Sequence, residues 1–241
     1  MGFVLGGGVV ALTAFLGGVT GFGAALVSTP ILLSLGFPLD FVVSINLTLL
    51  VVTRISVSYR LRKDVHFRIA SAFILSSVPG LYLGAKILVS VEASVIKFAA
   101  GLIVMISAVM LMRQGDTPGA PKIPGTTLLA GFAGGFLGST TSLIGVPPAI
   151  ALAHEKTLPT RFLGTLAAYF VVSGSIALAI LAAQGALVST ALFPTAVLWL
   201  PGVLLGNFLG VSLGSSLPKL TFERLTVYVI FVAGGVTLLT S

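Results

Sequence analysis

The hydrophobic pattern divides the chain into long apolar runs separated by short polar loops, and it predicts an all-α polytopic membrane protein. Asp, Glu, Lys and Arg are absent from three long stretches, residues 2–39, 126–153 and 162–218. A helix needs only about 20 apolar residues to cross a bilayer. The 241 residues therefore accommodate roughly six to eight membrane helices and leave no room for a soluble domain.

The apolar runs fall into two halves of the same plan, in which one glycine-rich segment is followed by three ordinary spans. We expect these elements at residues 2–36, 41–59, 69–89 and 93–112, and again at 126–153, 162–183, 190–217 and 221–240. Residues 113–125 have the Pro, Gly and polar content of an exposed linker. The predicted organisation is a first repeat at 1–112, a cytoplasmic linker at 113–125 and a second repeat at 126–241.

Short motifs recur at matching places in the two halves. Gly17-Gly18, Gly21, Pro30 and Thr48 return 117 positions later as Gly134-Gly135, Gly138, Pro147 and Thr165. The motif Pro79-Gly80-x-x-x-Gly84 returns as Pro201-Gly202-x-x-x-Gly206. Such a duplication, with glycine-interrupted apolar segments, is typical of secondary transporters, in which substrate binds where the repeats meet.

Loop charges predict that the two repeats are inverted in the membrane. The loop at 60–68 contains Arg60, Arg62, Lys63 and Arg68, but its counterpart at 184–189 has no charge. Because cytoplasmic loops carry the excess of Lys and Arg, equivalent loops are expected on opposite sides. Each half must then cross the membrane an odd number of times. The glycine-rich segment must therefore return to its own side, as a re-entrant hairpin or a pair of short helices.

Composition excludes several other classes. The formal net charge is +7, but the basic residues lie in short loops that orient membrane helices, so nucleic acid is not an expected partner. There is no cysteine, and the only histidines, His66 and His154, lie in charged loops. We therefore expect no metal site and no cofactor. The spans contain no group of acidic, basic and nucleophilic side chains at membrane depth, which argues against an enzyme.

The glycine-rich stretches 17–25 and 134–142 are the candidate substrate site. A helix break there exposes unpaired backbone N–H groups, which favour an anion, although the glycines could instead serve close helix packing. The run Ser139 to Ser142 adds hydroxyl donors, although hydroxyls in helices often bond to their own carbonyls.

Polar side chains inside the spans can complete this site or form interhelical hydrogen bonds; they include Asn46, Thr48, Thr165, Tyr169 and Asn207. Arg54 is ionisable within an apolar span, so it either binds substrate or extends to the cytoplasmic face. The predicted substrate-binding residues are Gly21, Phe22, Gly23, Asn46, Thr48, Arg54, Gly138, Ser139, Thr140, Thr141, Ser142, Thr165 and Asn207.

The repeated pattern resembles the TauE/SafE sulfite exporter family of small bacterial membrane transporters. The resemblance spans nearly the whole chain and depends on Gly17-Gly18-x-x-Gly21-Phe22-Gly23, the second copy from Gly134 to Pro147, and the repeated Pro-Gly-x-x-x-Gly motif. It implies that sulfite or an organosulfonate such as sulfoacetate crosses the inner membrane by alternating access. Where the family's second copy is usually glycine-rich, this chain has Ser139-Thr140-Thr141-Ser142, a run of donors that still favours an oxyanion.

Two alternatives stay open at this stage: a passive anion channel, and a transporter of another small carboxylate or oxyanion. The expected partners are a small anion and the lipid bilayer. Coupling to a proton or a sodium ion, the direction of transport and the formation of a homodimer are left undetermined by the sequence.

Overall fold

The computed structural model describes residues 2–92, 94–96, 98, 102, 125–154, 158–187, 189–218, 221, 224–225 and 228. The helices in this part of the chain are α1 (Gly2–Thr20), α2 (Gly23–Ser34), α3 (Leu39–Arg60), α4 (Phe67–Ser90), α6 (Thr126–Thr141), α7 (Val146–His154), α8 (Pro159–Ala183) and α9 (Ser189–Ser216). The linker expected at 113–125 and the spans expected at 93–112 and 221–240 lie almost entirely outside the described residues.

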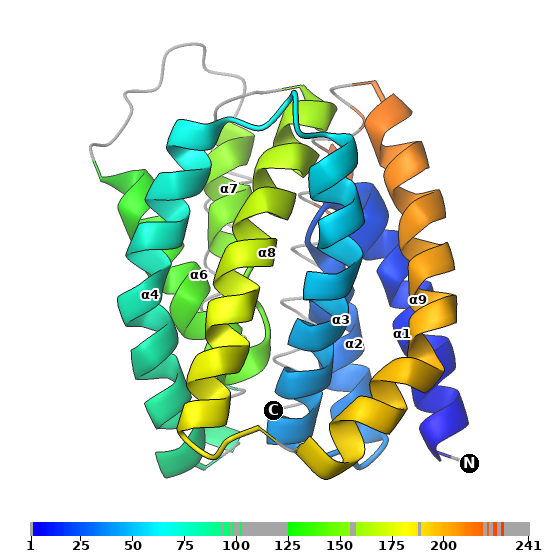
Figure 1. The fold of residues 1–241 in the computed structure, drawn as a ribbon, viewed down its shortest axis with the longest axis vertical. Helices are drawn as coiled ribbons and strands as arrows, with labels where there is room; N and C mark the ends of the chain where they lie inside the picture. Colours follow the sequence, from blue (N-terminus) through cyan, green and yellow to red (C-terminus); the bar gives the residue numbers. More distant parts are fainter. Residues whose placement is uncertain are drawn as a thin grey trace.

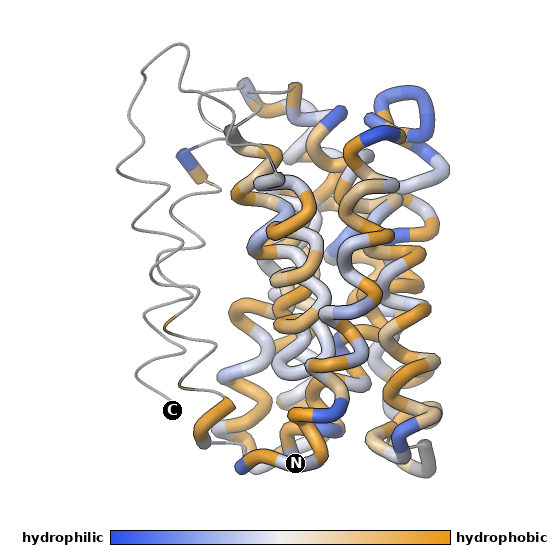
Figure 2. Tube along the Cα trace, turned by 90° about the vertical axis from the view of Figure 1, so that its left-hand side faces the viewer, coloured by the Kyte–Doolittle hydropathy of each residue, from blue (hydrophilic) through white to orange (hydrophobic). Residues whose placement is uncertain are grey.

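Five of these helices are long and apolar enough to cross a membrane: α1, α3, α4, α8 and residues Ala191–Ser216 of α9. The all-helical prediction is therefore confirmed, and the expected spans at 41–59, 69–89, 162–183 and 190–217 are found close to their expected bounds. Figure 2 shows hydrophobic residues along the sides of the bundle and hydrophilic ones gathered toward its ends, the distribution that a bilayer imposes.

Each glycine-rich segment folds as two helices joined by a short break. In Figure 1, α1 and α2 both have their outer ends at the lower end of the bundle, whereas α6 and α7 enter from the upper end. The first break lies at Gly21 and Phe22, inside the predicted stretch. Gly21 has a φ of +91°, a conformation that glycine adopts without the steric cost other residues meet.

The second break lies further along the chain than predicted. Gly134 to Thr141 remain helical within α6, and the chain turns only at Ser142, whose φ is 62°. The N–H of Leu143 donates to the carbonyl of Leu137 at 3.2 Å, which is the Schellman pattern of a helix end. The glycines of α6 allow close helix packing and do not break the helix. A Cβ on Gly135, for example, would overlap the carbonyl oxygen of Ser77 on α4.

The helices pair through such glycine contacts. α4 packs on α6, and α1 packs on α9, where the glycines of α9 meet carbonyl groups of α1. The long helices α3 and α8 lie at the centre and run antiparallel, because Gly164 lies beside Leu61 and Gly174 lies beside Val51. Both hairpins therefore pack against the central pair (Figure 1).

Candidate functional site

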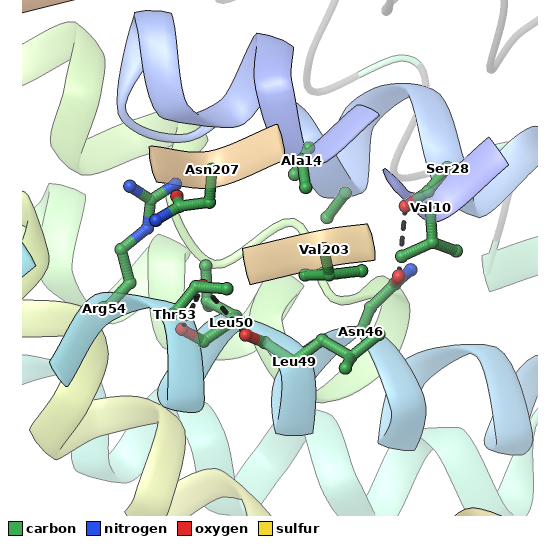
Figure 3. A pocket seen from close by; sticks show the side chains of 12 residues that line it. Val10, Ala14, Ser28, Asn46, Leu49, Leu50, Thr53, Arg54, Val203 and Asn207 are labelled. Carbon is green, nitrogen blue, oxygen red and sulfur yellow. Dashed lines mark hydrogen bonds between the residues drawn. The ribbon is translucent and has the colours of Figure 1, made fainter. Parts of the chain in front are cut away.

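A small cavity of about 30 Å³ lies among α1, α2, α3 and α9. Figure 3 shows Arg54 and Asn207 at one end of it, Ser28 and Asn46 at the other, and apolar side chains between them. Its lining residues are Val10, Ala14, Ala24, Ala25, Ser28, Asn46, Leu49, Leu50, Thr53, Arg54, Val203 and Asn207. Apart from Thr53, the polar side chains therefore lie at the two ends of the cavity.

Arg54 is the cation of this cavity, and only 2% of it is exposed. It does not extend to the membrane surface, so that alternative interpretation is wrong. Its Nη2 donates to the carbonyl of Gly17 at 2.8 Å, while its Nε has no hydrogen-bond partner. The guanidinium also lies 5.8 Å from the centroid of the Phe170 ring.

No carboxylate of the described residues pairs with Arg54. Removing an ion from water costs several kcal/mol even after the protein relaxes, unless an opposite charge compensates it. The cavity therefore presents a positive charge that lacks its counter-ion, which is an electrostatic arrangement suited to binding an anion.

Asn207 extends the donor set at the same end of the cavity. Its side chain lies beside the guanidinium in Figure 3 and makes no hydrogen bond within the described part of the chain. Its backbone is in contact with α1, because a Cβ on Gly18 would lie 2.7 Å from the carbonyl oxygen of Asn207. The absence of a side chain at Gly18 thus brings this amide next to Arg54.

The other end of the cavity is held by a buried hydrogen-bond network centred on Asn46. Ser28 donates to its Oδ1 at 3.0 Å, and its Nδ2 donates to Thr29 at 3.0 Å and to Ser142 at 3.3 Å. The hydroxyls of Thr29 and Ser142 lie 3.0 Å apart. This network joins α2, α3 and the α6–α7 break, so it is one of the places where the two glycine-rich segments meet.

The two helix breaks also approach each other directly. A Cβ on Gly145 would lie 2.6 Å from the Cβ of Phe22, so residues of the first and second breaks are in contact in the interior. The sequence-based expectation placed the two glycine-rich segments together, and the geometry agrees with it at this point. The cavity itself nevertheless lies to one side of this contact, among α1, α2, α3 and α9.

The predicted residues are not gathered into one site. Asn46, Arg54 and Asn207 line the cavity, and Ser142 bonds to Asn46. Gly21, Phe22 and Gly23 form the first break, where Gly21 faces Leu163, and do not line the cavity.

The remaining hydroxyls are committed elsewhere. Thr48 donates to the carbonyl of Ser44, Thr140 to that of Phe136 and Thr141 to that of Leu137, whereas Thr165 accepts from the backbone N–H of His66. Gly138 packs under Ile144. Ser139 is fully buried, and its hydroxyl has no partner.

Sequence reasoning missed Ser28, Thr29 and Thr53. The signal for the first two was present, because Ser28-Thr29 is a polar pair directly before Pro30 within an apolar run. No comparable signal marked Thr53, whose hydroxyl donates to the carbonyls of Leu49 and Leu50. No group of three or more His, Asp or Glu side chains lies together in the described ranges, and the donors of the cavity are guanidinium, amide and hydroxyl groups.

We expect Asn46→Leu to lower the melting temperature of the purified protein. Leucine matches the size of asparagine but leaves Ser28, Thr29 and Ser142 without its amide, and a buried unsatisfied polar group costs about 1–3 kcal/mol. Thermal unfolding in detergent measures the change. Ser175→Ala is the control, because the exposed Ser175 hydroxyl donates only to a carbonyl of its own helix. An unchanged melting temperature for Asn46→Leu would contradict the structural role of the network.

Comparison with known proteins bears on the whole chain. The family model described as "Sulfite exporter TauE/SafE" matches residues 6–237. No curated protein and no solved structure matches the chain.

Proposed function

Because the chain belongs to the TauE/SafE sulfite exporter family, and is therefore a multi-pass membrane transporter of anions and not an enzyme, we propose that its substrate is a small sulfur oxyanion. The candidates are sulfite and an organosulfonate such as sulfoacetate. The observation that carries this proposal is the buried Arg54, which has no carboxylate partner in the described chain and lines a cavity with two amides and two hydroxyls.

The donor chemistry supports an oxyanion. A sulfur oxyanion has several acceptor oxygens and no strong donor, so it complements the guanidinium of Arg54 and the side-chain amide of Asn207. The amide of Asn46 and the hydroxyls of Ser28 and Thr53 already donate to protein acceptors. Asp40, Asp64 and Glu92, the acidic residues in the described ranges, lie at loops or helix ends and not in the cavity. No carboxylate there would repel the anion.

We place the site at the interface of two inverted repeats that operate by alternating access. The cavity supports this because α1, α2 and α3 of the first half and α9 of the second half line it. The helix pairs support it too, since α1 contacts α9 as α4 contacts α6. The hairpins enter from opposite ends of the bundle (Figure 1), as inverted repeats require.

The proposed topology has a direct test, because the chain contains no cysteine. We expect cysteines placed at Arg62 and Lys156 to face the cytoplasm, and those at Pro38 and Gln184 to face outside. An impermeant maleimide applied to intact cells should label only the outer pair, whereas lysed cells should show labelling at all four. The cysteine-free parent gives the background. Equal labelling of Arg62→Cys and Gln184→Cys in intact cells would exclude the inverted arrangement.

The proposed function is tested by flux into proteoliposomes that contain the purified protein. We expect labelled sulfite or sulfoacetate to accumulate saturably, and the effect of an imposed proton or sodium gradient to identify the coupling ion. Non-saturating flux that ignores both gradients would favour a passive channel. Flux of an unrelated carboxylate, with none of either sulfur compound, would overturn the proposed substrate class.

A further inference from the structure

We infer that each chain has one anion site, formed by the cavity at Arg54, and that Phe170 fills the equivalent place in the second half. This inference rests on the proposed function. It goes beyond that function by placing the substrate only in the cavity at Arg54, and not in the equivalent region of the second repeat. Two repeats could in principle carry two equivalent cavities, so the number of sites is a separate question.

The internal duplication identifies the residues that would form a second cavity. The offset of 117 that relates Thr48 to Thr165 places Leu163 at the position of Asn46, Phe170 at that of Thr53 and Val171 at that of Arg54. The offset between Pro79 and Pro201 places Ala85 at the position of Asn207. The guanidinium and both amides of the cavity are thus replaced by hydrocarbon.

In the second half, the space that corresponds to the cavity is also filled by a side chain. The position of Ser28, which lines the cavity, corresponds to Gly145 in the second half. A Cβ on Gly145 would lie 2.6 Å from the Cζ of Phe170, so the ring occupies the room that a side chain would take there. Phe170 is fully buried. In the first half, Ser28 and Thr53 leave a cavity between them. In the second half, the ring of Phe170 packs against Gly145 and fills the equivalent space.

The second half gains three hydroxyls at positions that match lining residues of the cavity: Thr127 stands where the first half has Val10, and the other two are already engaged. Thr141 and Ser142 stand where the first half has Ala24 and Ala25. Thr141 donates to the carbonyl of Leu137 at 2.9 Å, and Ser142 belongs to the network of Asn46. Neither supplies a charge. An anion in the second half would therefore meet a filled interior without a charge at the corresponding positions, which strongly disfavours its entry.

Phe170 also packs against Arg54 from outside the residues that line the cavity. Its ring centroid lies 5.8 Å from the guanidinium carbon of Arg54, on α8 and therefore outside the set of helices that line the cavity. The same ring contacts Gly145 at the second break. Phe170 therefore lies between Arg54 and the α6–α7 break, so the second half contributes this packing from α8 and the amide of Asn207 from α9.

Equilibrium binding of radiolabelled sulfite to the purified protein, with the chain quantified by amino-acid analysis, tests this inference. We expect saturation at one sulfite per chain, with an affinity that Arg54→Gln lowers by about tenfold to a hundredfold. Two sulfites per chain in the parent, or parent-like affinity in a folded Arg54→Gln, would overturn the single site at Arg54 without affecting anion transport. Absence of both sulfite and sulfoacetate binding by the parent would instead overturn the proposed substrate class.

A transplanted site tests the role of Phe170 itself. The double variant Phe170→Thr with Val171→Arg installs the residue pair of Thr53 and Arg54 in the second half. We expect this variant to bind two sulfites per chain, since it opens the filled space and supplies a cation. Val171→Arg alone is the matched control, and it should still bind one, because the ring continues to fill the equivalent space. A folded double variant that binds only one would overturn the assignment of Phe170 as the filling residue.

Discussion

Arg54→Gln is expected to weaken binding of the transported anion by about tenfold to a hundredfold and to reduce its transport at low concentration correspondingly. Hydrogen bonds to charged groups contribute about 1.5–3 kcal/mol, and 1.4 kcal/mol corresponds to tenfold in affinity. The anion-free variant should unfold no more easily than the parent, because it no longer buries a cation without a carboxylate partner in the described chain. Stabilisation by added sulfite should then require a concentration about tenfold to a hundredfold higher.

The control for this variant is Arg60→Gln. Arg60 lies on the same helix, but it is exposed, and its guanidinium lies over the ring of Phe208 at 5.0 Å. Its replacement should leave anion affinity unchanged. Thermal unfolding with and without sulfite, together with initial rates of uptake, measures both variants. Parent-like affinity for a folded Arg54→Gln would show that the anion does not bind at Arg54, and equal losses in both variants would indicate a general effect of charge.

Gly210→Ala is expected to cause a large structural defect although it adds only a single methyl group. A Cβ at Gly210 would overlap the carbonyl oxygen of Phe15 and lie 3.0 Å from the Cα of Gly18. These are backbone atoms of α1, so α1 and α9 must separate to admit it. Overpacking costs about 1–3 kcal/mol where side chains can adjust, and here the backbone itself must move. We expect a loss of at least this size, seen as a lower melting temperature and less monodisperse protein.

Gly8→Ala provides the opposite case with the same chemical change. Gly8 is an exposed residue of α1, and a Cβ there meets no atom within 4 Å. Because alanine has the higher helix propensity, by roughly 1 kcal/mol, this variant should be neutral or slightly more stable. If Gly210→Ala were as stable as Gly8→Ala, the close contact between α1 and α9 would not contribute to folding in the way that the structure indicates.

Much of the fold could be predicted, because the runs of apolar residues that make helices cross a bilayer can be seen directly in the sequence. A bilayer requires long apolar helices whatever they pack against, so the spans of α3, α4, α8 and α9 follow from the runs of apolar residues alone. The break at Gly21 follows from a glycine cluster in the right place. The second break could not be located in the same way, since glycine permits both a turn and a close helix contact, and only the neighbouring α4 decides between them at Gly135.

For the candidate site, too, part of the answer came from the sequence and part only from the tertiary structure. The sequence by itself determined that Arg54, Asn46 and Asn207 are polar residues within apolar spans, and that such residues need partners. Only the tertiary structure decided that Arg54 turns inward to Gly17 rather than outward to the surface, and that Thr140 and Thr141 bond to their own helix. Hydropathy depends on the order of residues in the chain, whereas burial and hydrogen bonding depend on which helix faces pack together, and this is set by contacts between segments far apart in sequence.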